Sequence, residues 1–354
     1  MMAEPLIITR EEPMKKGQDV RDMLNKINND VKHKKDYIVQ LSNLKTETSM
    51  NTFPDLSFGK ENIQFLNLTD HSVSQLCAKL NIGSSYIKKC MPWQELAITN
   101  LNHWIGETKD RDLMIRSYEN QCRAILSDRY KRIDNDVIAT KGINRLLDMG
   151  FEIKYNYYDT DTLNITAVLP KLEGEIEKDD IVQGGVTITN SEIGGGSFNV
   201  KPFIYRLVCT NGMVVPEEIG RFYAKHVGKK IIDVDEDTQD EIVVEKMLDK
   251  LNYLKDDKLF ENIFEKMRES KKIISSSNDI VQLAKEHNLS DSERAGIFER
   301  LGHQYGDHFT YDNYSLANAL TNIANDEELS DTRARFFQEL GGQIIFYSKA
   351  NAVR

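Results

Sequence analysis

The spacing of apolar residues changes twice along the chain. Apolar residues recur at helical intervals within residues 14–45 and, more clearly, within Leu68–Cys90. From about residue 113 they alternate with polar residues, and after Pro216 the helical interval returns. This order predicts an α+β fold, with a central, mostly antiparallel sheet, a helical N-terminal segment and a helical C-terminal region.

The clearest early helix can be capped by Thr69 or Asp70, and Gly83 ends it. Its apolar face comprises Val73, Leu76, Cys77 and Leu80. A helix, a tight turn and a second helix can also read DNA in the major groove. Three lysines supply all the positive charge from there to Cys90, so an ordinary helical hairpin is the favoured interpretation.

Strands and one helix are expected in the middle of the chain. Leu113–Tyr118 and Gln121–Ser127 predict a hairpin, and Asp134 or Asn135 can cap a helix that ends at Gly150. Further strands are expected at Phe151–Tyr157, Leu163–Leu169, Gly185–Thr189 and Lys201–Thr210.

Two segments between these strands have sequences that predict a loop and a turn. The charged segment Lys171–Asp180 is expected to be a loop. Asn211-Gly212 is the strongest short turn signal of the chain. We therefore expect residues 1–64 to be a partly extended N-terminal segment, 65–230 an α+β core domain, and 231–354 a helical region packed on that core.

Composition limits the classes of protein that fit. The chain has 354 residues, 40% of them hydrophobic and 29% charged, with a net charge of −10. Its four cysteines form no CxxC pair, which favours free thiols in a reducing cytosol. No apolar run approaches the ~18 residues of a membrane span. We expect a soluble protein of the host-cell cytosol, or one carried in a virion, without membrane contact, metal or cofactor.

Several short motifs resemble ligand-binding sites but lack features that those sites require. Gly194–Gly196 precedes a strand, whereas a phosphate loop leads into a helix N-terminus. The acidic run from Asp233 resembles a calcium loop, but Thr238 replaces the required Gly and Val244 the bidentate Glu. His303 and His308 do not share a helix face, so they do not suggest a metal site.

One triplet retains a catalytic interpretation. Glu152 and Lys154 on a strand, with Asp134 or Asp136 upstream, match the minimal set of a metal-dependent nuclease. The helix expected between them spoils the geometry of adjacent strands. A nuclease is therefore kept only as an alternative.

Charge is unevenly distributed after the glycines. Residues 197–230 carry six Lys and Arg against two Glu, or +4, whereas residues 231–260 carry ten acids against four Lys, or −6. The basic segment is interleaved with Phe203, Tyr205, Phe222 and Tyr223. Cations with aromatics on a strand surface are typical of single-stranded nucleic-acid binding, although the aromatics can equally be core.

Several blocks of sequence resemble a known family. The blocks are Arg123–Tyr130, Ile133–Val137, Gly194–Phe198, Pro202–Arg206 and Cys209–Met213, with Leu76–Tyr86 upstream and Asn318–Thr321 downstream. Together they resemble the domain of unknown function 932 family of phage- and plasmid-borne proteins. The resemblance implies a mobile-element context, but it carries no activity and no catalytic residues.

These observations favour a non-enzymatic protein of phage or plasmid DNA metabolism that binds or anneals single-stranded nucleic acid. Its candidate nucleic-acid-binding residues are Arg123, Arg129, Tyr130, Lys131, Arg132, Lys201, Tyr205, Arg206 and Arg221. The alternatives are a structural or host-interaction protein, such as a virion component, and the metal-dependent nuclease. A homo-oligomer is also expected.

Overall fold

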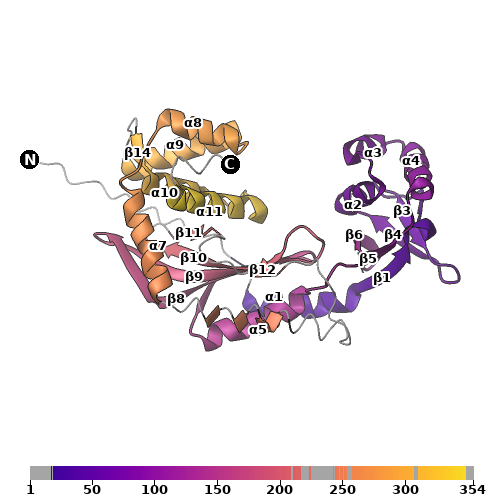
Figure 1. The fold of residues 1–354 in the computed structure, drawn as a ribbon, viewed down its shortest axis with the longest axis horizontal. Helices are drawn as coiled ribbons and strands as arrows, with labels where there is room; N and C mark the ends of the chain where they lie inside the picture. The colour runs from indigo at the N-terminus through magenta and orange to yellow at the C-terminus, as the bar shows by residue number, and fades with distance from the viewer. Residues whose placement is uncertain are drawn as a thin grey trace, which may run out of the picture.

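The computed structural model describes most of the chain. The described residues are 17, 19–208, 210–216, 223–224, 242, 244–246, 248–249, 251–252, 257–306 and 310–347. Two sheets, each with helices, organise these residues (Figure 1).

The first sheet lies in what we call the N-terminal lobe, residues 34–127. Its strands run in the order β1-β5-β6-β4-β3-β2, antiparallel except for β4 beside β6. Their bounds are β1 Lys34–Gln40, β2 Lys45–Glu47, β3 Asp55–Phe58, β4 Gln64–Leu68, β5 Asp112–Tyr118 and β6 Gln121–Ser127. One face is covered by α2 (Asp70–Leu80), α3 (Ser84–Cys90) and α4 (Gln94–Glu107).

The central sheet is antiparallel throughout, in the order β11-β10-β9-β8-β7, with β12 beside β10. The strands are β7 Glu152–Tyr158, β8 Thr162–Glu177, β9 Asp180–Ser191, β10 Phe198–Arg206, β11 Asn211–Val214 and β12 Tyr223–Ala224. In Figure 1, α1 (Val20–Asp30) and α5 (Asn135–Asp148) lie below this sheet, and α7 (Asp257–Ser270) crosses its left end down to the level of β8. The expected α+β architecture is confirmed.

The C-terminal region is helical and packs on the upper face of the central sheet (Figure 1). It contains α8 (Ser277–Glu286), α9 (Asp291–Tyr305), α10 (Asn313–Ile323) and α11 (Asp331–Phe346), with a short pair of strands, β13 (Ile274–Ser276) and β14 (Thr310–Asp312). No helix in the described part of the chain is long and apolar enough to cross a membrane.

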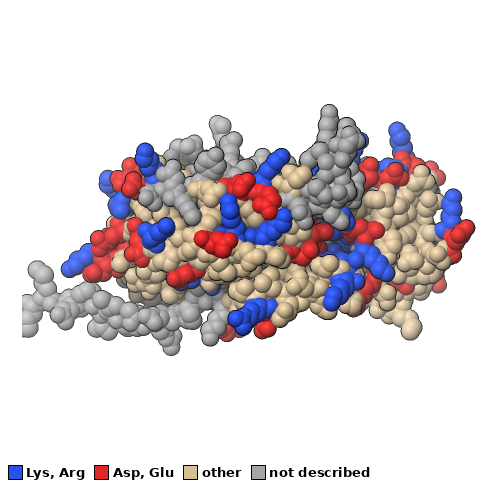
Figure 2. All heavy atoms as spheres, turned by 90° about the horizontal axis from the view of Figure 1, so that it is seen from below, with Lys and Arg blue, Asp and Glu red and all other residues tan. Residues whose placement is uncertain are grey.

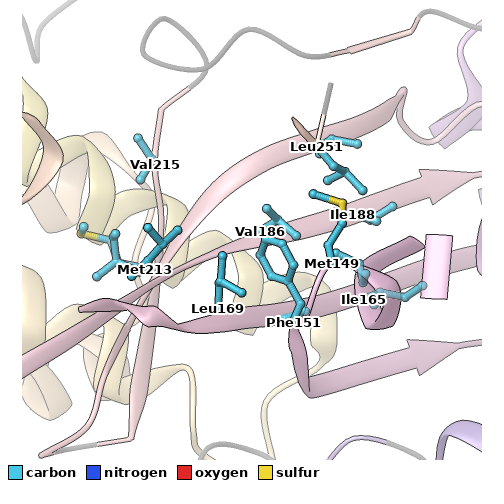
Figure 3. Close-up of a cluster of buried hydrophobic side chains, with 14 of the residues drawn as sticks. Met149, Phe151, Ile165, Leu169, Val186, Ile188, Met213, Val215 and Leu251 are labelled. Carbon is cyan, nitrogen blue, oxygen red and sulfur yellow. The ribbon is translucent and has the colours of Figure 1, made fainter. Parts of the chain in front are cut away.

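The main core lies around the central sheet. Figure 3 shows Ile165, Leu169, Val186 and Ile188 of β8 and β9 among the buried side chains of this cluster, with Phe151 close to them. These apolar side chains point off the sheet toward the helices, as expected for strands that alternate between two faces. The sheet therefore supplies the platform on which the polar clusters described below are built.

The charged segment Lys171–Asp180 is not a loop, contrary to expectation. β8 continues to Glu177 and β9 begins at Asp180, so the segment forms the end of a long hairpin that turns at Asp179, where φ is +66°. Charged residues are tolerated there because alternate positions of the hairpin point to solvent, while Leu172 and Ile176 pack inward.

The turn predicted at Asn211-Gly212 is also wrong. Both residues belong to β11. The turn lies earlier, and its described residues are Leu207, Val208 and Thr210, the last with φ of +47°. Gly212 is needed for packing: a Cβ added there would lie 2.0 Å from Cζ of Phe203. The strict alternation expected for β7 fails as well, because a bulge between Ile153 and Tyr155 shifts the register.

Other local predictions hold. Thr69 caps α2 through a capping box, and Ser290 caps α9 in the same way. The division expected at residue 64 falls on the first residue of β4, inside the first sheet. The N-terminal lobe therefore includes β1 to β3, which precede that division.

Candidate functional site

Glu192 lies between the two sheets, directly after β9, and its side chain is fully buried. The carboxylate accepts hydrogen bonds from Lys34 Nζ at 2.8 and 2.9 Å and from both terminal nitrogens of Arg123 at 3.1 Å. It also accepts the backbone N–H of Asn135 at 2.8 Å. A buried carboxylate is stable only with partners of this kind. Glu192 therefore connects β1, β6 and the first turn of α5.

Arg116 on β5 is the second centre of this network, with 1% of its surface exposed. Its Nε donates to Asp36 Oδ1 at 3.0 Å, its Nη2 to Asp134 Oδ1 at 2.6 Å, and its Nη1 to the backbone oxygen of Glu192 at 3.1 Å. Burial alone would lower the pKa of Arg116, but Asp134, Asp36 and Glu192 raise it well above its ordinary value. The guanidinium therefore stays charged and joins the N-terminal lobe to the central sheet.

Asp134 occupies the N-cap of α5, but its side chain makes no capping bond. Burial would raise the pKa of Asp134, whereas the adjacent Arg116 outweighs this effect and lowers it. The carboxylate of Glu192 instead accepts the hydrogen bond from the backbone N–H of Asn135, the first residue of α5. The side-chain oxygen of Asn135, Oδ1, accepts from Asn190 Nδ2 at 2.9 Å. The expected capping position is correct, and the expected capping bond is not formed.

Two further carboxyl groups border the network. Burial raises the pKa of Asp136, and the nearby Asp134 and Glu192 raise it further. Burial also raises the pKa of Asp161, against the effect of Arg123, which donates to it at 3.2 Å. Within the residues that the structure describes, no group of three or more His, Cys, Asp and Glu is arranged to hold a metal ion. We term Glu192, with Lys34, Asp36, Arg116, Arg123, Tyr130, Asp134 and Asn135, the Glu192 network.

A second buried ion pair lies between the central sheet and the C-terminal helices. Arg206 donates two hydrogen bonds to the carboxylate of Asp180, from Nε at 2.7 Å and from Nη2 at 2.9 Å. Tyr314 of α10 donates its hydroxyl to the same carboxylate at 2.7 Å. Burial raises the pKa of Tyr314, with Arg206 opposing and Asp180 reinforcing the shift. The pair fixes α10 on the sheet.

Two cavities between the central sheet and the C-terminal helices are too small for an organic ligand. The one beside Arg206 and Asn211 has a volume of about 10 Å³, and another beside Tyr155 and Asn325 has about 20 Å³. A space of this size holds about one water molecule. Buried Asn211 Oδ1 and Asn325 Nδ2 find no protein partner in the described residues, which suits such a water.

The structure places several predicted nucleic-acid-binding residues in the interior. Arg123, Arg206 and Tyr130 are buried, and the Tyr130 hydroxyl donates to the backbone oxygen of Ser191 at 3.1 Å. Each arginine is paired with a buried acid, because a guanidinium removed from water needs a counter-charge. The side chains of Arg123 and Arg206 therefore do not lie on an open face.

The remaining candidates lie closer to the surface. Arg129 is exposed, and Lys131 and Arg132 are half-buried in the segment before α5. Lys201 pairs with Glu339 at 3.1 Å. Tyr205 is half-buried, with Lys154 Nζ 5.9 Å from the centre of its ring. Arg221 and Phe222 lie outside the described residues, and Phe203 of the predicted aromatic strip is fully buried.

Sequence reasoning missed four members of the Glu192 network: Lys34, Asp36, Arg116 and Glu192 itself. None belongs to a short motif, and Glu192 lies 69 residues from Arg123. A weak signal existed in the blocks of family resemblance, which supply Arg123, Tyr130 and Asn135 to this network and Arg206 to the second.

A comparison with protein-family models supports the family resemblance of these blocks. A family model described as "Domain of unknown function (DUF932)" matches residues 124–325, more than half of the chain. No curated protein and no solved structure matches the chain.

Proposed function

The chain belongs to the domain of unknown function 932 family, and from that premise we propose a non-enzymatic protein of bacteriophage or plasmid DNA metabolism that binds single-stranded nucleic acid. The proposal moves the binding surface away from Arg123 and Arg206. It rests on the cations left outside the Glu192 network, where the N-terminal lobe meets the central sheet.

The supporting observation is a set of basic residues that lie just before β1, on β1 and in the segment that leads from β6 to α5. Lys32, Lys35 and Arg129 are exposed, and Lys131 is half-buried. Arg132 Nη1 lies 3.7 Å from Oδ2 of Asp36 on β1, which brings the segment before α5 alongside that strand. We call Lys32, Lys35, Arg129, Lys131 and Arg132 the junction cations.

The local charge of these segments is positive, whereas that of the whole chain is negative. Residues 26–36 and 128–136 together carry seven Lys and Arg against five Asp, or +2, in a chain of net charge −10. Asp30 and Asp36 are turned inward, since Asp30 accepts the Tyr118 hydroxyl and Asp36 accepts from Arg116. The exposed side chains of Lys32, Lys35 and Arg129 can therefore contact phosphates, which dominate nucleic-acid affinity.

The contact is expected to be short. Figure 2 shows Lys and Arg side chains interspersed with Asp and Glu over one side of the molecule, without a continuous basic track. Three phosphate contacts give a salt dependence of about −2 in log K against log salt for a single strand. Binding is thus predicted at low salt and is expected to be weak near physiological salt.

Fluorescence anisotropy with a labelled oligothymidylate at several salt concentrations tests this proposal. The variant Lys32→Glu/Lys35→Glu/Arg129→Glu should lose about tenfold or more in affinity, with a flatter salt dependence. The matched control is Lys60→Glu/Lys272→Glu/Lys285→Glu, which reverses three exposed lysines elsewhere. Absence of wild-type binding at low salt rejects the function, and equal losses in both variants reject the site.

A nuclease receives less support from the arrangement of its candidates. Lys154 Nζ bonds Glu152 Oε2 at 2.8 Å, so the lysine expected to orient a water is engaged by the expected metal ligand. A structural or interaction protein remains the second candidate. It is favoured by the exposed side chains of Trp93, directly before α4, and Trp104, within it.

A further inference from the structure

The N-terminal lobe contains two helices joined by a short turn, apart from the junction cations. Helix α2 ends at Leu80, three residues follow, and α3 begins at Ser84. Asn81, the first residue of the turn, has φ of +57°, and its backbone N–H donates to the carbonyl oxygen of Ala78. A left-handed residue at this position ends a helix and redirects the chain. The turn therefore sets the direction of α3 relative to α2.

The inner sides of both helices share one core. Buried apolar side chains of this core are Leu76, Cys77 and Leu80 from α2, and Ile87 and Cys90 from α3. Helix α4 contacts both α2 and α3, so three helices pack together. Lys88 of α3 also donates to Asp70, the first residue of α2, at 2.6 Å. A helix-turn-helix is organised in this way, and its second helix enters the major groove of DNA.

The outer side of α3 is polar and exposed. At about 100° per residue, Ser85 and Lys89 each lie about 160° from buried Ile87, on the side of the helix that faces away from the core. Both are exposed, and Tyr86 between them is 54% exposed. Within the described residues, these three side chains form no hydrogen bond or ion pair with another residue. We call Ser85, Tyr86 and Lys89 the α3 outer face.

The charge of the helix pair suits a polyanion. Residues 71–94 contain no Asp or Glu and three lysines, in a chain of net charge −10. Two acids border this segment: Asp70 accepts from Lys88, and Glu95 is exposed in the first turn of α4. At the C-terminal end of α2, the pKa of Lys79 is lowered by burial and by Arg111, and Asp128 opposes this effect. The cation on the α3 outer face itself is Lys89.

From this arrangement we infer that α3 is the recognition helix of a helix-turn-helix that binds double-stranded DNA in its major groove. The major groove is about 12 Å wide and admits an α-helix. Figure 1 shows α3 at the upper end of the N-terminal lobe, beyond α2, where a duplex can reach it. Lys89 and Ser85 supply donors for base edges and phosphates.

The number of lysines alone favours an ordinary helical hairpin. The left-handed turn, the shared core of three helices and the exposed polar outer side of α3 together favour the DNA-reading motif. This surface and its ligand differ from those of the single-strand proposal, on which the inference does not rest.

Fluorescence anisotropy of the full chain with a labelled duplex of mixed sequence, at low salt, tests this inference. The wild type should bind, and Lys89→Glu should lower the affinity by about tenfold or more, because it places a negative charge in the groove. The matched control is Lys285→Glu, which reverses an exposed lysine in the last turn of another short helix, α8, and should change the affinity little. Circular dichroism confirms that each variant is folded.

Two further measurements separate groove reading from general attraction to phosphates. Methyl green, a ligand of the major groove, should displace the protein from the duplex, whereas netropsin, a ligand of the minor groove, should not. Selection from a pool of random duplexes should recover a preferred sequence with the wild type. Ser85→Ala/Lys89→Ala should relax that preference, because contacts to base edges are lost.

Absence of duplex binding by the wild type at low salt overturns the inference. Equal losses in Lys89→Glu and Lys285→Glu overturn it, as does displacement by netropsin and not by methyl green. Tighter binding of a single strand than of the duplex, with the same dependence on Lys89, also overturns it. Reversal of Lys32, Lys35 and Arg129 should leave duplex binding intact, which distinguishes failure of the single-strand proposal from failure of this one.

Discussion

Glu192 shows how a single side chain can hold several elements. Its carboxylate oxygens balance the positive charges of Lys34 and Arg123, whose side chains are both shielded from solvent. Glu192→Gln keeps the shape and removes the negative charge. Loss of one partner of a buried ion pair typically costs about 3–5 kcal/mol. We expect a decrease of that size in the free energy of unfolding, measured by urea denaturation.

Glu327→Gln is the control for that measurement. Glu327 is exposed, and exposed substitutions usually change stability by less than about 0.5 kcal/mol. Equal stability of the two variants would show that Lys34 and Arg123 find other partners or reach water when Glu192 is neutral.

The ion pair of Glu293 and Arg333 predicts a dependence on pH. Hydrogen bonds from Arg333, at 2.6 and 2.8 Å, lower the pKa of Glu293 from 4.5 to about 2. Because the folded pKa is depressed, the stabilisation is fully present above pH 4.5 and is lost as the pH falls through 2. Arg333→Gln should destabilise the protein near neutral pH, and the difference from wild type should shrink in acid.

Titration of the Glu293 carboxyl by NMR measures the same effect directly. In Arg333→Gln its pKa should return toward the ordinary value. A midpoint that stays near 2 in the variant would assign the shift to Ser290 instead, which also bonds this carboxylate.

Residue types could be identified from sequence, but their surroundings could not. Arg123 and Arg206 were predicted to contact phosphates, Arg206 because its basic segment is interleaved with aromatics. Their actual partners are 69 and 26 residues away, respectively, and are brought close only by the strands between them. Burial of charge depends on such non-local pairing, which a local pattern does not contain.

At the level of elements, predictability follows how local the determinant is. Capping boxes such as Ser290 with Glu293 are formed within four residues, and they were predicted correctly. Asn211-Gly212 has the local signature of a turn, but pairing with Tyr205 and Arg206 places it in a strand. The charged end of the β8–β9 hairpin was likewise mistaken for a loop, because the contacts that stabilise it come from helix α7 and the residues after it.

Packing of that hairpin against α7 gives a prediction for Gly184. A Cβ added there would lie 2.5 Å from the ring of Phe260, which is buried at 1% exposure. Gly184→Ala should therefore destabilise the protein by about 1–3 kcal/mol through overpacking. In the Phe260→Leu background the same substitution should cost less, because the ring that it strikes is absent.

A double-mutant cycle by chemical denaturation measures this coupling. Gly106→Ala is the control, since no atom lies within 4 Å of a Cβ added at that position of α4. Equal costs of Gly184→Ala in both backgrounds would show that the strand shifts away from α7, and that Phe260 does not limit the space.

For the whole molecule, the fold class was predictable but the first sheet was not. Periodicity indicates strands after residue 113, whereas the sheet also recruits β1 from the N-terminal segment and pairs β4 with β6 in parallel. β1 begins 78 residues before β5, and such a separation leaves no signal in the spacing of apolar residues.

The junction between the lobe and the central sheet predicts how the molecule unfolds. Arg116 joins them by bonding Asp134 and the backbone of Glu192, while the small apolar cluster around Met114 and Tyr130 adds limited contact. Both tryptophans lie in the lobe, so their fluorescence reports on the lobe, and far-ultraviolet circular dichroism reports on the whole chain. In the wild type the two denaturation curves should coincide if the junction makes unfolding cooperative.

Arg116→Met should separate these curves. The variant leaves Asp36 and Asp134 without their buried cation and removes the bond to the backbone of Glu192, so the lobe should unfold at lower denaturant than the central sheet. Arg145→Met is the control, because Arg145 pairs with Asp249 on the surface, away from the junction. Coincident curves in Arg116→Met, shifted together to lower denaturant, would mean that apolar contacts and not the charged network couple the two parts.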